Sequence, residues 1–483
     1  MLHSLSLQTF FSDYRRGPLD EVFDAHGDVR PLYRSFIEAL VKTGSAGLAA
    51  RERVVAQTFQ GLGITFALPS VSGNIERPIP FDILPRLIST DHWQRIASGV
   101  AQRVRALNAF IADVYGDQRI LRAGIIPEEF IYQSPLFTPQ MMGVRVPNDV
   151  WITVAGIDVV RIGEESYAVL EDNVRSPSGV SYVLENRLIS SRLWAQLMRQ
   201  HRVSPVSQYP QELLETLFSI REGKWVVLTP GVYNSAYFEH SLLANQMGLD
   251  LVEAQDLVVH NHQLHTRTTK GLQPVVGAYR RVDEEYLDPL TFRPDSVIGV
   301  PGLGQLLPQQ QLALANAVGT GIGDDKAVYR YVPQMIAYYL GESPLLENIP
   351  TYLPSIPKEQ DYIFAHWKDL VIKPVAASGG KGVQFGDKLD KSSTQSLQQA
   401  IRQDPRQFIA QPILKFSQAP CYADGEWEPR YIDLRPFCLN GAQETVVLPG
   451  GLTRVSADSK NRIVNSSQGG STKDTWVERR PLC

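Results

Sequence analysis

The sequence predicts a multidomain protein of mixed architecture, α+β with an α/β part, on three observations. The first 145 residues repeat apolar side chains at helical spacing. Two β-hairpin patterns follow, near residues 160 and 375, each with β-rich runs around a polar or glycine-rich turn. Between them, from Gly223, short apolar strands alternate with helical segments, which is typical of a small sheet-and-helix domain.

Length and composition limit the class of protein. A chain of 483 residues exceeds what one hydrophobic core organises, and we expect about two or three domains. A net charge of −4 argues against nucleic acid as the main partner. Three cysteines without metal-site spacing argue against a disulfide scaffold, and the lack of a long apolar run argues against a membrane span. We therefore expect a cytoplasmic protein without a nucleic-acid or membrane partner.

Residues 1–145 are predicted to be mostly helical. Apolar side chains recur every three or four positions over residues 28–42, 48–59 and 89–114. In the last of these segments the stripe begins at Trp93 and ends at Val114, and a stripe of this kind faces a core. We expect these helices to pack rather than to carry chemistry.

Residues 146–205 begin with a predicted hairpin whose second strand ends in polar side chains. Because strand side chains alternate, Glu171 and Asn173 should share a face with Tyr167 and Val169, whereas Asp172 should point to the other face. A helix is expected from about Tyr182 to Gln200.

The same hairpin offers candidate ligands for a cation. Carboxylate and amide oxygens two residues apart on one strand suit Mg²⁺, so Glu171 and Asn173 are candidates, and Asp158 on the partner strand is a third. The alternative is that Glu171, Asp172 and Asn173 form an ordinary turn. Arg175, in the polar segment that follows, is then a surface charge.

Residues 206–300 are predicted to form a small inserted α/β domain. Arg280 and Arg281 are adjacent at the end of one of its strands, so one of them should point inward. A guanidinium placed there can hold a carboxylate or a phosphate.

Residues 301–483 carry the clearest candidate for phosphate binding. Lys373 ends a β-branched run, and a turn rich in small residues follows: Ser378, Gly379, Gly380, Lys381 and Gly382. Glycines let backbone N–H groups approach an anion, and the two lysines add positive charge, which suits a polyphosphate. The spacing matches neither a Walker loop nor G-x-G-x-x-G. The alternative is a solvated hairpin with ordinary surface lysines.

Four other features of this part point the same way. Lys326 follows two aspartates and is a candidate second phosphate ligand, or else the exposed side of a helix start. The short apolar strand at residues 407–414 offers backbone groups to a purine edge. Arg435 and Arg454 lie in runs that otherwise resemble core strands, and unpaired charges are expensive to bury there. A binding site explains them.

Taken together, these motifs resemble the circularly permuted ATP-grasp family, which is related to the synthetase domain of glutathionylspermidine synthase. The resemblance spans about residue 18 to Trp476, and it rests on Val169–Gly179 with Glu185–Arg187, Asp324–Lys326, the Lys373 hairpin, Asp433–Pro436, Gly450–Arg454 and Ser467–Gly470. It implies a circularly permuted ATP-grasp fold with a helical N-terminal part and an inserted domain similar to a pre-ATP-grasp domain. The metal-binding segment then precedes the nucleotide-binding lid.

The resemblance also implies an ATP- and Mg²⁺-dependent ligase that joins a small-molecule or peptide carboxylate to an amine through an acylphosphate. The implied Mg²⁺ ligands are Asp158, Glu171 and Asn173, and the implied phosphate ligands are Lys326 and Lys373. The loop from Ser378 to Gly382 covers the phosphates, and Gln411, Pro412 and Ile413 form the adenine hinge. The expected catalytic or acceptor-binding arginines are Arg454, Arg435, Arg175 and Arg281.

Two other functions stay open at this point. One is a nucleotide-binding regulatory or scaffold protein without ligase turnover, because nothing in the sequence identifies an amine pocket. The other is a small-molecule kinase that phosphorylates a carboxylate or alcohol and stops there.

Overall fold

The computed structural model describes residues 10–62, 65–70, 73–78, 80–377, 379–423, 425–464 and 469–479, with side chains outside residues 60–79. Its centre is a ten-stranded sheet that runs in the order β13-β5-β4-β18-β21-β22-β3, with β17, β19 and β20 attached. The strands span Glu347–Asn348 (β13), Tyr167–Asn173 (β5), Val154–Arg161 (β4), Glu426–Arg435 (β18), Leu452–Val455 (β21), Ser471–Val477 (β22), Phe81–Ile88 (β3), Gln418–Ala423 (β17), Phe437–Asn440 (β19) and Thr445–Val447 (β20).

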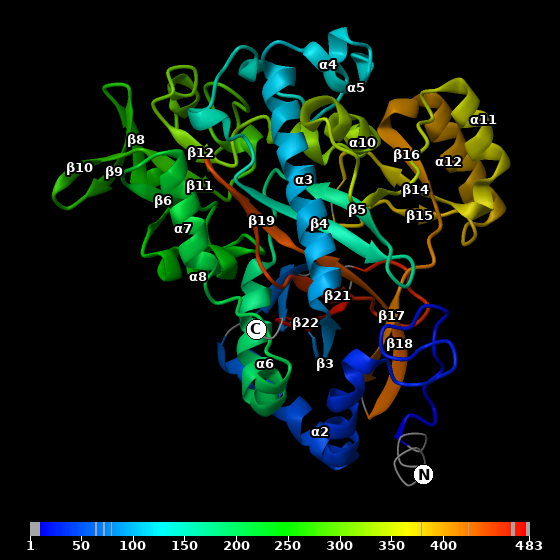
Figure 1. Ribbon diagram of the computed structural model, residues 1–483. Coiled ribbons are helices and arrows are strands. Elements are labelled where there is room, and N and C mark those ends of the chain that lie inside the picture. The colour runs from blue at the N-terminus through cyan, green and yellow to red at the C-terminus, as the bar shows by residue number, and fades with distance from the viewer. Residues whose placement is uncertain are drawn as a thin grey trace.

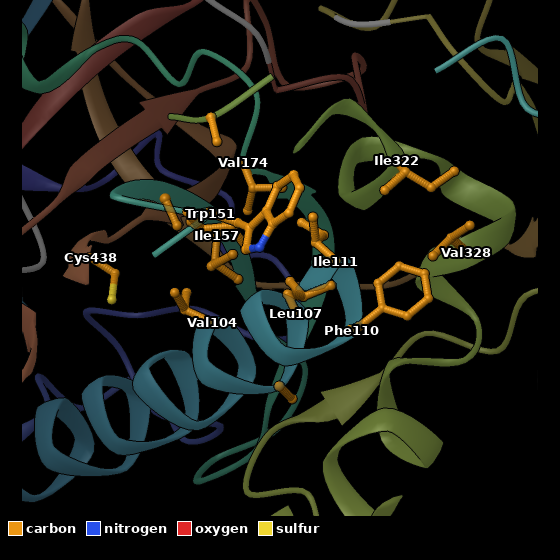
Figure 2. Packing of buried hydrophobic residues seen from close by; sticks show 14 of the residues in the cluster. Val104, Leu107, Phe110, Ile111, Trp151, Ile157, Val174, Ile322, Val328 and Cys438 are labelled. Atoms are coloured by element: carbon orange, nitrogen blue, oxygen red, sulfur yellow. The ribbon is translucent and has the colours of Figure 1, made fainter. Parts of the chain in front are cut away.

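One long helix, α3 (Thr90–Tyr115), crosses this sheet and carries much of the core (Figure 1). Ser89 caps it, because its side chain accepts a hydrogen bond from the N–H of His92. The predicted apolar stripe from Trp93 to Val114 is buried as expected. Figure 2 shows Leu107 and Ile111 of this helix beside Trp151 and Ile157. The helix therefore supports the sheet from one side.

The remaining helices cover other faces. Helix α6 (Val180–Gln200) packs against β21, β22 and β3, and it also contacts α2 (Arg34–Leu62), which is interrupted at Gly44 with φ +68°. The predicted helices at 28–42 and 48–59 are thus two halves of one kinked element. Short helices follow at Arg119–Arg122 (α4), Glu129–Tyr132 (α5), Lys326–Tyr329 (α9) and Val332–Met335 (α10). Within the described ranges, none of the helices combines the length and apolar character needed to cross a bilayer.

The N-terminal part is less helical than predicted. A hairpin of β1 (Thr65–Ser70) and β2 (Gly73–Pro78) precedes β3, and β3 pairs in parallel with β22 at the far end of the sequence. Pro85 inside β3 is incompatible with a helix interior, and the polar residues of this strand are paired. Asp82 lies 2.9 Å from the Nζ of Lys473, and Arg86 lies 2.6 Å from Glu21.

The inserted part is the predicted small α/β unit. A parallel sheet runs in the order β12-β11-β6-β7, formed by Ala313–Ala315 (β12), Gly277–Arg280 (β11), Trp225–Leu228 (β6) and Asp250–Val252 (β7). Helices α7 (Tyr209–Ile220) and α8 (Tyr237–Met247) accompany it. An antiparallel sheet is formed by Leu257–His260 (β8), Gln263–Thr268 (β9) and Gly271–Val275 (β10). Strand β12 lies beyond the predicted boundary at residue 300, so the unit extends further along the chain.

A separate unit, residues 357–412, is called the lid below. Its antiparallel sheet runs in the order β15-β14-β16, formed by Gln384–Phe385 (β15), Leu370–Pro374 (β14) and Phe408–Pro412 (β16). Helices α11 (Pro357–Ala365) and α12 (Lys391–Gln403) pack on one face of this sheet against Leu370 and Ile372. Because strand side chains alternate, Val371 and Lys373 face the other way, toward the central sheet.

Candidate nucleotide site

A pocket lies where the lid meets the central sheet. Its walls combine acidic and amide side chains of β4 and β5, arginines of β18 and β21, Lys326, and the inner face of the lid. The predicted site residues that line it are Asp158, Glu171, Asn173, Lys326, Lys373, Gly379, Gly380, Lys381, Gln411, Pro412, Ile413, Arg435 and Arg454. Segments far apart in the sequence thus meet around one space.

The end of β5 differs from the predicted alternation. Glu171 pairs with Asp158 across the hairpin, but Val169 pairs with Val159, so Leu170 is an extra residue that forms a β-bulge. Leu170 and Glu171 consequently both line the pocket. Tyr167 and Asp172 instead contact α3, where they meet His92 and Arg103. The prediction that Glu171 shares a face with Tyr167 and Val169 is therefore wrong, because the bulge reverses the alternation.

Asp158, Asp433 and two arginines form a buried cluster at one side of the pocket. Arg435 binds Asp158 with two hydrogen bonds, Nε to Oδ1 at 2.6 Å and Nη2 to Oδ2 at 2.9 Å. Arg454 donates to Asp158 at 2.6 Å and, through Nε, to Asp433 at 3.0 Å. Burial alone would raise the pKa of Asp158, but the two guanidinium groups outweigh it and lower that pKa to about 2. The cluster is neutral overall, and both guanidinium groups are held in place.

Two lysines line the pocket near Glu171. Lys326 follows Asp325, which caps α9, and its Nζ lies 2.9 Å from Glu171 Oε1 and 2.5 Å from the carbonyl oxygen of Ala377. Lys373 donates to Gln411 Oε1 at 2.7 Å. Burial lowers the pKa of Lys373 to about 8, although Glu171 acts in the opposite direction. Glu171 thus offsets one ammonium group, and the second remains as excess positive charge for an anion.

Two of the three predicted metal ligands fit a cation site in this structure. Glu171 lines the pocket, and the Asn173 amide nitrogen is buried with no hydrogen-bond partner in the part of the chain that the structure describes. The protein therefore does not fix the orientation of this amide, whose oxygen can turn to a cation. Both oxygens of Asp158 already accept guanidinium N–H groups. Mg²⁺ commonly takes one or two protein ligands and completes its shell with phosphate and water.

The predicted purine hinge has apolar walls. Pro412, Ile413 and Leu414 line the pocket with Val371 and Phe416. The N–H of Ile413 donates to the carbonyl oxygen of Asp369 at 2.9 Å, so this donor is already used within the lid. This part of the lining is apolar, as is common where ligands bind.

Comparison with known proteins bears on this geometry. A family model described as circularly permuted ATP-grasp type 2 matches residues 85–456. The chain belongs to the circularly permuted ATP-grasp family. The matched range contains every predicted site residue, and its order, with the acidic hairpin before the lid, is the permuted order expected from the sequence.

Relatives of this ATP-grasp chain come from several bacteria. An uncharacterized protein of Mycobacterium tuberculosis is 47% identical over 471 residues, which cover 96% of this chain and 85% of that protein. An uncharacterized protein of Synechocystis sp. is 44% identical over 463 residues, which cover 95% of this chain and 96% of that protein. A Frankia alni protein named "Putative glutamate--cysteine ligase 2-3" is 39% identical over 97% of this chain but only 54% of its own length.

A solved structure shares the fold. A glutathione synthetase-like effector from Globodera pallida superimposes with a TM-score of 0.60 at 9% identity, covering 89% of this chain and 97% of that one. At this identity the likeness concerns the ATP-grasp fold alone.

Some predicted residues lie elsewhere in this ATP-grasp chain. Arg281 is buried against Glu239 at 3.0 Å and donates to the carbonyl oxygen of Pro177. Arg175 lies between Asp283 and Asp324, at 3.8 and 4.0 Å. Neither guanidinium lines the pocket, because each one balances nearby acids instead. Gly382 is also absent from the described lining, and Ser378 falls outside the described residues.

Sequence reasoning assigned no site role to two contributors, Asp324, which it named only as part of a motif, and the loop that contains Arg462. Asp324 accepts hydrogen bonds from the N–H groups of Val174 and Arg175 at 2.6 and 3.2 Å, which fixes the turn after Asn173, and burial raises the pKa of Asp324 to about 7. Arg462, Ile463 and Val464 line the pocket from the loop after β21. That loop follows no nucleotide-binding pattern, so only its position in the fold reveals it.

Proposed function

We propose that this protein is an ATP- and Mg²⁺-dependent carboxylate–amine ligase that acts through an acylphosphate. One observation carries the proposal: Glu171 and Asn173 of β5 line the same pocket as Lys326 and Lys373, and Lys326 lies 2.9 Å from Glu171. A triphosphate with a divalent cation needs oxygen ligands on one side and ammonium groups on the other. Family membership supports ATP as the nucleotide.

Binding of the nucleotide follows from these contacts. Val371, Leu414 and Phe416 would contact the purine, and Lys326 and Lys373, which line the same pocket, would bind the phosphates. Glu171 and the Asn173 oxygen would hold Mg²⁺, which would neutralise phosphate charge. The backbone at Gly379 and Gly380 lines the phosphate end, where the absence of side chains permits close approach.

The first chemical step joins a substrate carboxylate to the γ-phosphate. A carboxylate oxygen forms a bond to phosphorus, the bond from phosphorus to the β–γ bridging oxygen breaks, and ADP leaves. Two anions approach each other, so the ammonium groups of Lys326 and Lys373 and the guanidinium of Arg454 must offset their repulsion. Asp158 and Asp433 hold that guanidinium before the substrate arrives, which reduces reorganisation during the reaction.

The second step forms the amide. The amine nitrogen attacks the acyl carbon, phosphate leaves with the C–O bond electrons, and the nitrogen loses a proton. Water competes with the amine for the acylphosphate, so the lid must exclude it. Arg435 lies beside Asp158 in the pocket wall, where it binds Asp158 and donates to the Ser178 carbonyl oxygen. This is a suitable position from which to orient the acid substrate.

The name of the Frankia alni relative is compatible with a ligase, but that protein is about twice as long as the matched part. We propose a carboxylate and an amine as substrate classes for this chain, both small molecules or peptides. The lining includes the polar side chains of Arg435 and Arg454, which suit a polar substrate rather than an apolar acyl group.

The test is phosphate release from Mg²⁺-ATP with panels of amino acids and peptides, and amide products detected by mass spectrometry. Glu171→Gln and Lys373→Ala should each lower turnover by roughly 10²-fold or more, because each removes a charge that acts on the transition state. Glu222→Gln and Lys270→Ala change the same residue types outside the pocket lining and should behave as wild type. Full activity of either site variant would refute the assignment.

The same assay separates the two other functions. A kinase would release a phosphorylated product and no amide. A regulatory or scaffold protein would bind ATP without phosphate release from any acid and amine pair.

A further inference from the structure

A loop of the core reaches the lid beside the nucleotide pocket. After β21 the chain runs through residues 456–464, and Arg462, Ile463 and Val464 line the pocket. Asp458 Oδ1 accepts hydrogen bonds from the N–H groups of Lys460 and Asn461, both at 2.8 Å. The Asn461 side chain accepts another from the N–H of Ile463 at 2.9 Å. These local bonds give the loop a defined shape, so Arg462 has a fixed place.

Arg462 joins this loop to the lid. Its Nη1 lies 2.7 Å from Asp387 Oδ2, and its guanidinium carbon lies 5.8 Å from the ring centre of Phe385. In a second contact the lid supplies the donor: Lys388 donates to the carbonyl oxygen of Lys460 in the loop at 3.4 Å. Phe385 itself lines the pocket, so the contact lies at the pocket wall.

The position of this contact matters because the lid has another attachment. Ala377, just after β14, accepts the Lys326 hydrogen bond. Asp387 lies near the opposite end of β14, since the neighbouring Gly386 N–H donates to the carbonyl oxygen of Leu370 at the start of that strand. A five-residue strand is roughly 15 Å long. The lid is therefore held to the core at both ends of its pocket-facing strand.

We propose that Arg462 and Asp387 form a latch that closes the lid over the nucleotide, and that Arg462 contacts the bound nucleotide while paired with Asp387. The guanidinium of Arg462 also interacts with the Tyr431 side chain. It carries five N–H donors, more than these two partners use, and it lines the pocket. Its natural acceptors there are oxygen atoms of the nucleotide. Arg462 is thus a positioning and binding residue that slows nucleotide release. The inference rests on the proposed ATP site.

The experiment measures dissociation of a fluorescent N-methylanthraniloyl ATP with Mg²⁺ by stopped flow. Asp387→Asn removes the latch but keeps Arg462, and it should raise the dissociation rate by about twofold to fivefold, as expected for a half-exposed ion pair. Arg462→Ala removes the latch and the nucleotide contact, and it should raise the rate by about tenfold or more.

The control is Arg293→Ala, which breaks another exposed ion pair, with Asp295 at 2.7 Å, outside the pocket lining, and should leave the rate unchanged. If Arg462→Ala dissociates as wild type does, or no faster than Asp387→Asn, the proposed nucleotide contact is refuted. If wild type binds no ATP analogue at all, the proposed ATP site fails instead. Unchanged melting temperatures show that both variants are folded.

Discussion

Lys373 is a residue of the site whose charge depends on its surroundings. Burial lowers its pKa to about 8, so the amine is largely neutral above that pH in the free protein. A bound triphosphate favours the ammonium form and raises the pKa again. Nucleotide binding at pH 8.5 should therefore take up roughly half a proton or more, and affinity should fall as pH rises further.

Calorimetric titration with Mg²⁺-ATP in two buffers of different ionisation enthalpy measures this uptake. Lys373→Met should lose it at pH 8.5, whereas Lys270→Met, at an exposed turn, should keep it. At pH 6.5 neither protein should take up a proton through this group, because Lys373 is already charged. Equal uptake by wild type and Lys373→Met would show that another group titrates.

Single residues also show how far the sequence could predict the site. The family resemblance led us to expect Glu171, Asn173, Lys326 and Lys373 around one ligand, and the four residues line one pocket. The sequence could not reveal the bulge at Leu170, because a bulge depends on how two strands pair and not on either strand alone. Nor could the sequence reveal that Arg281 pairs with Glu239 instead of lining the pocket, because only the fold brings these two side chains together.

At the scale of elements, helices α9 and α12 each begin with an aspartate N-cap, but one aspartate is buried and the other lies at the surface. Asp325 caps α9 and also accepts from Arg406 and Ser134, both at distances below 2.8 Å and away from solvent. Asp390 caps α12 at the surface through the N–H of Ser393. Asp325→Ala leaves the Arg406 charge buried and unpaired, so it should lower the free energy of unfolding by about 3–5 kcal/mol.

Urea denaturation of Asp325→Ala and Asp390→Ala checks this expectation, since the second variant loses a cap without stranding a charge. Its loss of stability should be clearly smaller. Equal losses would mean that capping, rather than the buried pair, dominates at Asp325. Because Lys326 follows the cap directly, Asp325→Ala should also weaken ATP binding.

Elements with strong local patterns were predictable, and elements defined by distant partners were not. The stripe of α3 and the β14 run have the expected form because periodicity and composition determine them. Strand β3 was missed because Pro85 interrupts its pattern and its pairing partner, β22, lies at the other end of the sequence. Arg462, Ile463 and Val464 line the pocket only because the fold brings their loop beside the lid.

At the scale of the whole molecule, the nucleotide pocket lies between two units, so occupancy should change how the lid is exposed. Lys381 lies exposed at the glycine-rich turn of the lid and lines the pocket. Trypsin should cut after it, and Mg²⁺-ATP at ten times its Kd should slow that cut about tenfold, because the ligand protects the closed form.

Lys270 is the internal reference for this experiment, because it lies at an exposed turn of the inserted unit away from the lid. Its cleavage should not respond to nucleotide. Protection of both sites would indicate general stabilisation, and protection of neither would contradict ATP binding at the lid. Mass spectrometry of the fragments distinguishes the two cuts.

The parallel pairing of β3 with β22 has a consequence for biosynthesis. A ribosome delivers residues 81–88 early, but their neighbour in the sheet, residues 471–477, emerges only after nearly all the intervening chain. The early strand must wait without its β22 partner while the lid and the inserted unit are synthesised. Chaperone dependence during translation, and not thermal stability of the finished protein, is where this topology should be most visible.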